Sequence, residues 1–193
     1  MLPNPKPHVT EDEYLAFERD AEGKHELING EIVAMSGGSP RHSLIAQNIG
    51  WRLAAALGGG RCLVFSSDLR VQVESTRLYT YPDVTVVCGT PQYSPHDRHT
   101  VVNPTLIIEV LSPSTEAWDR GAKFAHYRRL PALQGVLLVS QDACRIEHFQ
   151  RVADERWLLT EATEGTLELA ALGVTLRVDE VYAGVDQLGD GQG

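Results

Sequence analysis

The sequence lacks the features of membrane-spanning, exported and thiolate-zinc proteins. No apolar run approaches the roughly 20 residues that a transmembrane helix requires. The N-terminal segment MLPNPKPHVTEDEY carries prolines and acids where a secretory signal has a basic start and an apolar stretch. The three cysteines, Cys62, Cys88 and Cys144, do not have the spacing of a metal site. Each lies in an apolar, strand-like run, so we expect buried, reduced thiols in a cytoplasmic protein.

The sequence also lacks an excess of positive charge. It has 26 Asp and Glu residues against 17 Lys and Arg, which gives a net charge of −9 and a pI near 5.2. Proteins that grip phosphates usually present a basic face, so this balance argues against a nucleic-acid partner. Carboxylates gathered around a metal would add negative charge that the bound ion neutralises locally, which keeps a metal-dependent nucleic-acid enzyme open.

Length and composition indicate one ordinary globular domain. The 193 residues suffice for one sizeable core and are too few for two, and 42% of them are apolar and 22% charged. The sequence contains no internal repeat, low-complexity block or linker. We therefore predict a single domain over residues 1–185 and a flexible tail over residues 186–193.

Hydrophobic periodicity predicts a mixed α/β (α+β) fold. Thr10 and Glu13 form a capping box that starts one helix, and Ser39-Pro40 starts a second. A third helix is expected from about Thr115 to Arg129, because Pro131 stops it. Residues 90–103 are expected to form a loop. Predicted strands cover residues 62–65, 69–73, 83–88, 105–111 and 136–140, and shorter ones the segments RIEHF, RWLLT, TLELA and VTLRV.

The run HELINGEIVAM predicts a β-hairpin with Asn29-Gly30 as its two-residue turn. In that register Ile28 faces Glu31, so Glu26, Ile28, Glu31 and Val33 share one face, with the two glutamates ~7–8 Å apart. Like charges in this arrangement are unfavourable unless they are solvated or share a cation. A solvated hairpin is the simpler explanation.

Two acidic residues lie where strands normally exclude them. Asp83 opens the β-branched run DVTVV, and Glu109 lies inside the apolar strand TLIIEVL. A buried, unpaired carboxylate is costly, so Glu109 needs a cation, a metal or a proton nearby. If the two strands are neighbours, the carboxylates converge at one end of the sheet, where a hard divalent cation such as Mg²⁺ suits them. The alternatives are a turn acid at Asp83 and a buried salt bridge at Glu109.

The predicted third helix carries another candidate residue. Asp119, Lys123 and Tyr127 are spaced i, i+4, i+8 and therefore lie along one face. A lysine over the metal could hold a phosphate or orient the attacking water as a positive point charge. The alternative is a solvated pair between Asp119 and Lys123, which is common on helices.

Four segments resemble the Uma-two family of restriction-endonuclease-like proteins, which is placed in the PD-(D/E)XK nuclease superfamily. They are, in order, ELINGEIVAMSGGSPRH, YPDV, IIEVLSPST and DRGAKFAHY, and the resemblance runs from about Thr10 to Tyr182. It implies a restriction-endonuclease-like core, with a mixed central sheet flanked by helices, an extra N-terminal helix and hairpin, and C-terminal strands. It also implies a metal-dependent endonuclease that uses Mg²⁺ or Mn²⁺.

The resemblance assigns site residues as well. Asp83 matches the acid of the PD element and Glu109 the second acid, and together they would hold the metal. The superfamily's lysine usually lies two residues after the second acid, where this sequence has Leu111. Lys123, from the following helix, is therefore the expected substitute. The candidate catalytic residues are Asp83, Glu109 and Lys123, and the supporting residues are Glu26, Glu31, His42 and Tyr127.

Several polar residues are assigned no clear chemistry. His42, in the first turn of its predicted helix, faces either the site or the surface, and Gln47 is a weaker candidate on the same helix. Ser112 and Ser114 resemble helix caps, because no Ser/His/Asp arrangement is evident. The scattered histidines lack metal-ligand spacing and are interpreted as structural; these are His96, His99, His126 and His148.

The leading hypothesis is a metal-dependent phosphodiesterase that acts on nucleic acid, with DNA as the expected substrate. A second is a non-catalytic nucleic-acid- or protein-binding regulator that keeps the nuclease fold, which the acidic charge favours. A third is a metal-free hydrolase with paired carboxylates, as in glycosidases. The apolar, β-rich C-terminal third also suggests a homodimer, by analogy with nucleases that cut two strands with two subunits.

Overall fold

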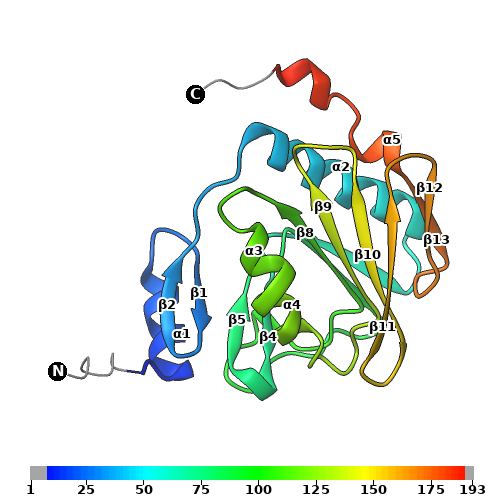
Figure 1. Ribbon diagram of the computed structural model, residues 1–193. Helices are drawn as coiled ribbons and strands as arrows, with labels where there is room; N and C mark the ends of the chain where they lie inside the picture. The colour runs from blue at the N-terminus through cyan, green and yellow to red at the C-terminus, as the bar shows by residue number, and fades with distance from the viewer. Residues whose placement is uncertain (1–7, 190–193) are drawn as a thin grey trace.

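A six-stranded mixed sheet forms the centre of the computed structural model, which describes residues 8–189 (Figure 1). Its strand order is β11-β10-β9-β8-β6-β3, and only β8 and β9 are parallel neighbours. Six of the predicted strands are therefore present and joined into this sheet, and the predicted strands at residues 69–73, TLELA and VTLRV lie in other sheets. Their bounds are β3 Cys62–Ser66, β6 Val84–Cys88, β8 Leu106–Leu111, β9 Gly135–Ser140, β10 Ile146–Ala153 and β11 Arg156–Ala162.

A second sheet, of five short strands, has the order β2-β1-β5-β4-β7. The predicted hairpin is confirmed, because Ile28 on β1 pairs with Glu31 on β2. Helix α1 (Glu11–Asp20) starts at the predicted capping box and packs Tyr14 onto this sheet, beside the hairpin in Figure 1. The remaining bounds are β1 His25–Ile28, β2 Glu31–Ala34, β4 Arg70–Val73, β5 Leu78–Thr80 and β7 Thr100–Val101.

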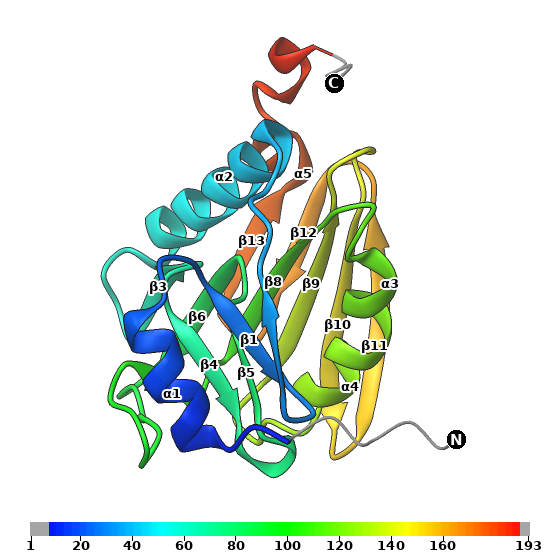
Figure 2. The ribbon, with the colours of Figure 1, turned by 90° about the vertical axis from the view of Figure 1, so that its left-hand side faces the viewer.

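Helix α2 (Pro40–Leu57) covers one face of the six-stranded sheet. Its apolar stripe of Ile45, Ile49 and Leu53 packs against alternate residues of β6 and β8, such as Val86 and Ile108. Figure 2 shows α2 beside β12 and β13, which close the same core. The C-terminal elements are β12 Thr166–Leu169, β13 Val174–Arg177, α5 Val178–Val181 and the 3₁₀ helix η3 Val185–Leu188.

The opposite face is covered by the second sheet and by the helix that follows β8. This helix has three parts: α3 (Glu116–Trp118), a π-helical turn η2 (Asp119–Lys123) and α4 (Phe124–Tyr127). Its extent agrees with the expected third helix, but the π-helical turn in its middle is not expected from sequence. Such turns are rare and are often found at functional sites.

The expectation of three buried, reduced thiols is wrong. Cys62 and Cys88 are directly opposite on the antiparallel strands β3 and β6, and they form a disulfide. Cys144 is free and exposed. Their distance in sequence concealed the pairing, because only the strand register brings the first two cysteines together.

The start of the predicted C-terminal tail is helical. The predicted tail begins at residue 186, yet residues 185–188 form η3, with Val185 buried. Residues 190–193 of that tail lie outside the described residues. Within residues 8–189, no helix has the length and apolar character needed to cross a membrane.

Candidate functional site

Asp83 and Glu109 lie side by side at one end of the six-stranded sheet. Strands β6 and β8 are antiparallel neighbours that pair Val84 with Ile108, so the same register sets Asp83 opposite Glu109. The alternation along β8 turns Ile108 toward α2 and Glu109 toward the helix that follows β8. The two acids therefore meet as their strand patterns predict.

Asp83 is held by groups from two elements. Its Oδ2 accepts a hydrogen bond from the backbone N–H of Val110 at 2.7 Å and lies 3.2 Å from Nε2 of His42, on the first turn of α2. The hydrogen bond to Asp83 raises the pKa of His42, although burial opposes it, and a further bond to the backbone of Val110 acts in the same direction. Of the two alternatives for His42, the structure selects the one that faces the site.

Glu109 is almost completely removed from solvent, with 5% of its surface exposed. Its Oε1 lies 3.0 Å from Nζ of Lys123 and accepts a hydrogen bond from the hydroxyl of Tyr127. Burial raises the pKa of Glu109 to about 8; Lys123 opposes this rise, and the charges of Asp119 and Asp83 add to it. The local positive charge is thus insufficient to hold Glu109 fully ionised near neutral pH.

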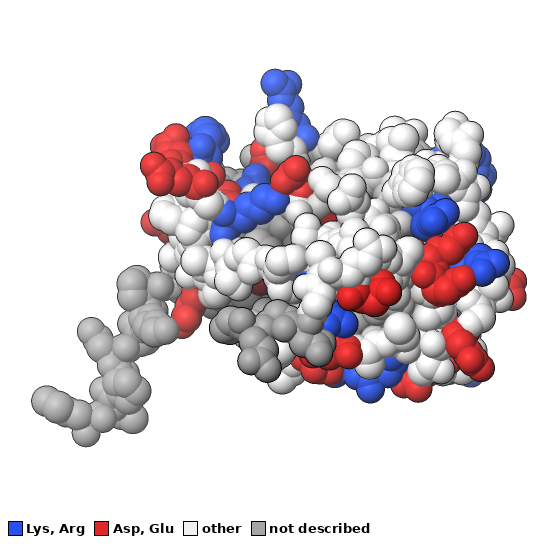
Figure 3. Space-filling view, turned by 90° about the horizontal axis from the view of Figure 1, so that it is seen from above, with Lys and Arg blue, Asp and Glu red and all other residues white. Residues whose placement is uncertain are grey.

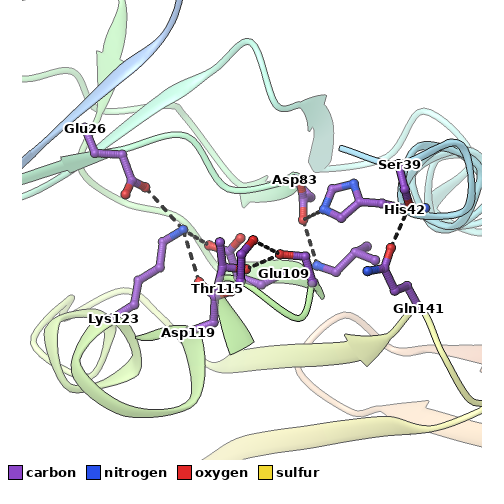
Figure 4. Close-up of polar contacts among 12 residues, drawn as sticks. Glu26, Ser39, His42, Asp83, Glu109, Thr115, Asp119, Lys123 and Gln141 are labelled. Atoms are coloured by element: carbon purple, nitrogen blue, oxygen red, sulfur yellow. Dashed lines mark hydrogen bonds and ion pairs between the residues drawn. The ribbon is translucent and has the colours of Figure 1, made fainter. Parts of the chain in front are cut away.

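Lys123 is enclosed by three carboxylates rather than exposed to solvent (Figure 4). Its Nζ lies 3.0 Å from Glu109, 3.2 Å from Glu26 and 3.6 Å from Asp119. Burial lowers the pKa of Lys123, but the surrounding carboxylates raise it overall. The alternative of a solvated pair is wrong, because Lys123 is 5% exposed and Asp119 4%.

Asp119 is a site residue that was missing from the candidates. Its i, i+4 spacing to Lys123 was the available signal, but that spacing also describes an ordinary surface pair. The π-helical turn spans the two residues, and burial raises the pKa of the Asp119 carboxyl.

The two hairpin glutamates differ in their surroundings. Glu26 is buried, accepts a hydrogen bond from the hydroxyl of Thr80 and contacts Lys123, so a solvated position is excluded for it. Glu31 shares the same face of the hairpin but lies next to the turn, where it is exposed. It is not among the residues that line the cleft described below.

These side chains open onto a cleft of about 1220 Å³. Its walls are α2, the hairpin with the loop after β2, and the ends of β6 and β8; Asp83, Glu109, Lys123, Glu26 and His42 all line it. Figure 2 shows α2 and the helix that begins at α3 on opposite sides of β8. The cleft is larger than the ~300–1,000 Å³ typical of sites for small ligands.

The residues present fit a hard divalent cation. Among residues 8–189, no group of three or more His, Cys, Asp or Glu side chains is arranged to hold a metal. Mg²⁺ does not require such a cage, because one or two carboxylates suffice and water and substrate phosphate complete its octahedron. Asp83 and Glu109 would supply these oxygen atoms. Burial raises the pKa of Glu109, and a bound cation would favour its ionised form.

A mixed sheet covered by helices, with acids on two neighbouring strands, defines a restriction-endonuclease-like fold. A similar architecture occurs in a crystal structure described as "a putative nuclease belonging to DUF820" from Anabaena variabilis. The two align with a TM-score of 0.75 at 17% identity, over 92% of this chain and 99% of that chain.

The chain belongs to the Uma2 family, described as "putative restriction endonuclease", whose model matches residues 11–179. Two Synechocystis sp. relatives, the uncharacterized proteins slr1290 and sll1609, are each 40% identical to it. The first match spans 185 residues, which is 94% of this chain and 95% of the relative. The second spans 153 residues, 79% and 86% respectively. The family resemblance inferred from the four sequence segments is thereby confirmed.

Proposed function

We propose that the protein is a metal-dependent endonuclease that hydrolyses phosphodiester bonds in nucleic acid, with DNA as the expected substrate. The observation that carries this proposal is the pairing of Asp83 and Glu109 on adjacent strands, at the wall of an open cleft. These two residues would hold Mg²⁺ or Mn²⁺. The bound ion would supply a water of lowered pKa and stabilise charge on the scissile phosphate.

The neighbouring side chains position the two acids. The hydroxyl of Tyr127 and the ammonium of Lys123 meet at one oxygen of Glu109, so they fix its orientation and favour its ionised form. His42 and the backbone of Val110 do the same for Asp83. Lys123 is the positive charge beside the acids, so it is our candidate for stabilising charge that develops on the phosphate.

Glu26 and Asp119 have an indirect role in this proposal. Both contact the ammonium of Lys123 and neither contacts Asp83 by a hydrogen bond or ion pair in the described residues. They would hold Lys123 in place and keep it protonated. We therefore expect Glu26→Gln to lower the rate of cleavage more than it lowers the affinity for Mn²⁺.

The first test is calorimetric titration of Mn²⁺ into chelator-treated wild type, Asp83→Asn and Glu109→Gln. Glu31→Gln is the matched control, because it removes an acid of the same region that does not line the cleft. We expect the wild type and the control to bind Mn²⁺ and both site variants to lose binding. The same proteins are then incubated with labelled single-stranded DNA, duplex DNA and RNA.

Cleavage in Mg²⁺ or Mn²⁺ that both site variants lose would support the proposal. Cleavage that persists in Asp83→Asn and Glu109→Gln would reject the assignment of these acids. Absence of Mn²⁺ binding by the wild type, both alone and with nucleic acid, would reject the metal-dependent mechanism.

The second candidate function is a non-catalytic nucleic-acid- or protein-binding regulator. The net charge of −9 favours it, and on the face of the described residues in Figure 3 basic and acidic side chains are interspersed without a continuous basic surface. Binding of labelled nucleic acid without turnover in Mg²⁺ or Mn²⁺ would favour this function over the nuclease.

A homodimer remains part of the proposal. Strand β11 is an edge of the six-stranded sheet and exposes Leu158 and Leu159 on its two faces, while its partner β10 exposes Val152 at a β-bulge. Exposed apolar side chains on a sheet edge favour association with another chain. Sedimentation is expected to show a dimer at micromolar concentration, and a stable monomer would reject it.

A further inference from the structure

The cleft continues from the paired acids along helix α2. The face of α2 that lines it has residues spaced three and four apart, among them His42, Ala46, Gly50 and Ala54. These side chains are small except at the first position, where His42 contacts Asp83. Trp51, the residue after Gly50, also lines the cleft and is the largest side chain of α2 to do so.

Trp51 is exposed in a way that packing does not explain. Its exposed fraction is 66%, although tryptophan gains much free energy from burial. The guanidinium of Arg52 lies 5.1 Å from the ring of Trp51 and is itself 3.6 Å from Glu180. Phe65, on β3, lines the cleft as well. The cleft therefore presents an exposed aromatic ring, supported from one side, in addition to its carboxylates.

The geometry of α2 sets the distance between the exposed Trp51 ring and the paired acids, which His42 contacts through Asp83. Trp51 follows His42 by nine residues, or two and a half turns, so it lies ~13 Å further along the axis of α2 and on the opposite side of the helix, where its 66% exposed ring forms the rim of the cleft. A ligand that touches both must be an extended molecule. A polynucleotide with a phosphate at the acids would place a base a few nucleotides away beside Trp51.

We infer that the cleft binds single-stranded nucleic acid, with a phosphate at the cation held by Asp83 and Glu109 and an unpaired base stacked on Trp51. The position of the phosphate rests on the proposed function; the stacking rests on the exposed ring. Only an unpaired, unstacked base offers its face to an aromatic side chain. A single strand has a lower charge density than a duplex, so a chain of net charge −9 repels it less, and stacking adds binding energy that does not depend on charge.

Fluorescence anisotropy in Ca²⁺, without Mg²⁺ or Mn²⁺, tests this inference, and gel electrophoresis checks that the probes stay intact. The probes are a labelled oligothymidylate, its duplex with oligoadenylate, and an oligouridylate of equal length. Trp51→Ala is compared with Tyr93→Ala, because Tyr93 is 52% exposed but lies outside the cleft lining. Trp51→Phe keeps an aromatic ring, and thermal unfolding checks that each variant is folded.

We expect Trp51→Ala to weaken binding of the oligothymidylate about 5- to 150-fold, the loss typical of one stacked base. Trp51→Phe should retain most of the affinity, and Tyr93→Ala should stay within about twofold of wild type because its ring lies elsewhere. The duplex should bind more weakly than the single strand. Comparing the affinities for the oligouridylate and the oligothymidylate shows whether the cleft prefers RNA or DNA.

Three results would overturn the inference: equal affinities of Trp51→Ala and wild type, a duplex that binds as tightly as the single strand, or no binding of any probe. Metal-dependent duplex cleavage that Trp51→Ala leaves unchanged would overturn it while supporting the nuclease function. Binding of single strands that depends on Trp51, without cleavage in Mn²⁺, would support the inference and count against the nuclease function.

Discussion

Replacing Glu109 by glutamine is expected to change how the stability of the metal-free protein depends on pH. Burial raises the pKa of Glu109 to about 8 from its ordinary value of 4.5. The folded state therefore holds a proton on Glu109 that the unfolded state releases between these two values. The stability that this proton contributes is fully present below the ordinary pKa and is lost as pH rises through the raised one.

The size of the effect follows from the one proton involved. A difference of one bound proton changes the free energy of unfolding by ~1.4 kcal/mol per pH unit. Between about pH 5 and about pH 7.5, the free energy of unfolding of the wild type should therefore fall by up to ~3 kcal/mol more than that of Glu109→Gln. Glutamine preserves the size of the side chain and an oxygen that can accept from Lys123 and Tyr127, so packing changes little.

Urea unfolding in chelator, followed by tryptophan fluorescence across this pH range, measures the difference. In the Glu31→Gln control, the free energy of unfolding should depend on pH as it does in the wild type. Added Mn²⁺ should stabilise the wild type at the upper end of the range, because the cation binds only the ionised form of Glu109, and should not stabilise Glu109→Gln. Parallel pH profiles for wild type and Glu109→Gln would refute the inferred pKa shift.

Three further predictions concern the surroundings of the acids and the disulfide. Lys123→Ala should abolish cleavage and largely retain Mn²⁺ binding, as measured by calorimetry; retained cleavage would remove Lys123 from the mechanism. It should also lower the free energy of unfolding by ~3–5 kcal/mol, because the buried carboxylates lose their cation. His42→Ala should weaken Mn²⁺ binding about 10-fold or more, because Asp83 loses a partner that fixes its orientation, and unchanged affinity by calorimetry would contradict this. Cys62→Ser with Cys88→Ser should reduce the free energy of unfolding by ~3.5 kcal/mol, the loop-closure entropy for a sequence separation of 26. Replacing the exposed free cysteine, Cys144, with serine should not alter the melting temperature.

Local sequence determined the helices, the hairpin and most strands. The capping box at Thr10, the proline after Ser39 and the Asn29-Gly30 turn act through hydrogen bonds and dihedral preferences within a few residues. The two acids in strands were visible for a related reason, because a carboxylate breaks an otherwise apolar pattern. The short strands β5 and β7 escaped prediction, since three and two residues are too few for a periodic signal, so the expectation that residues 90–103 are all loop was wrong.

Tertiary structure alone decided which of these residues meet. Strand register joined Cys62 to Cys88, and the position along the hairpin buried Glu26 while leaving Glu31 exposed. The π-helical turn brought Asp119 into the site together with Lys123. These outcomes depend on contacts between residues far apart in sequence, and a spacing of i, i+4 is the same whether the pair lies in water or between two sheets.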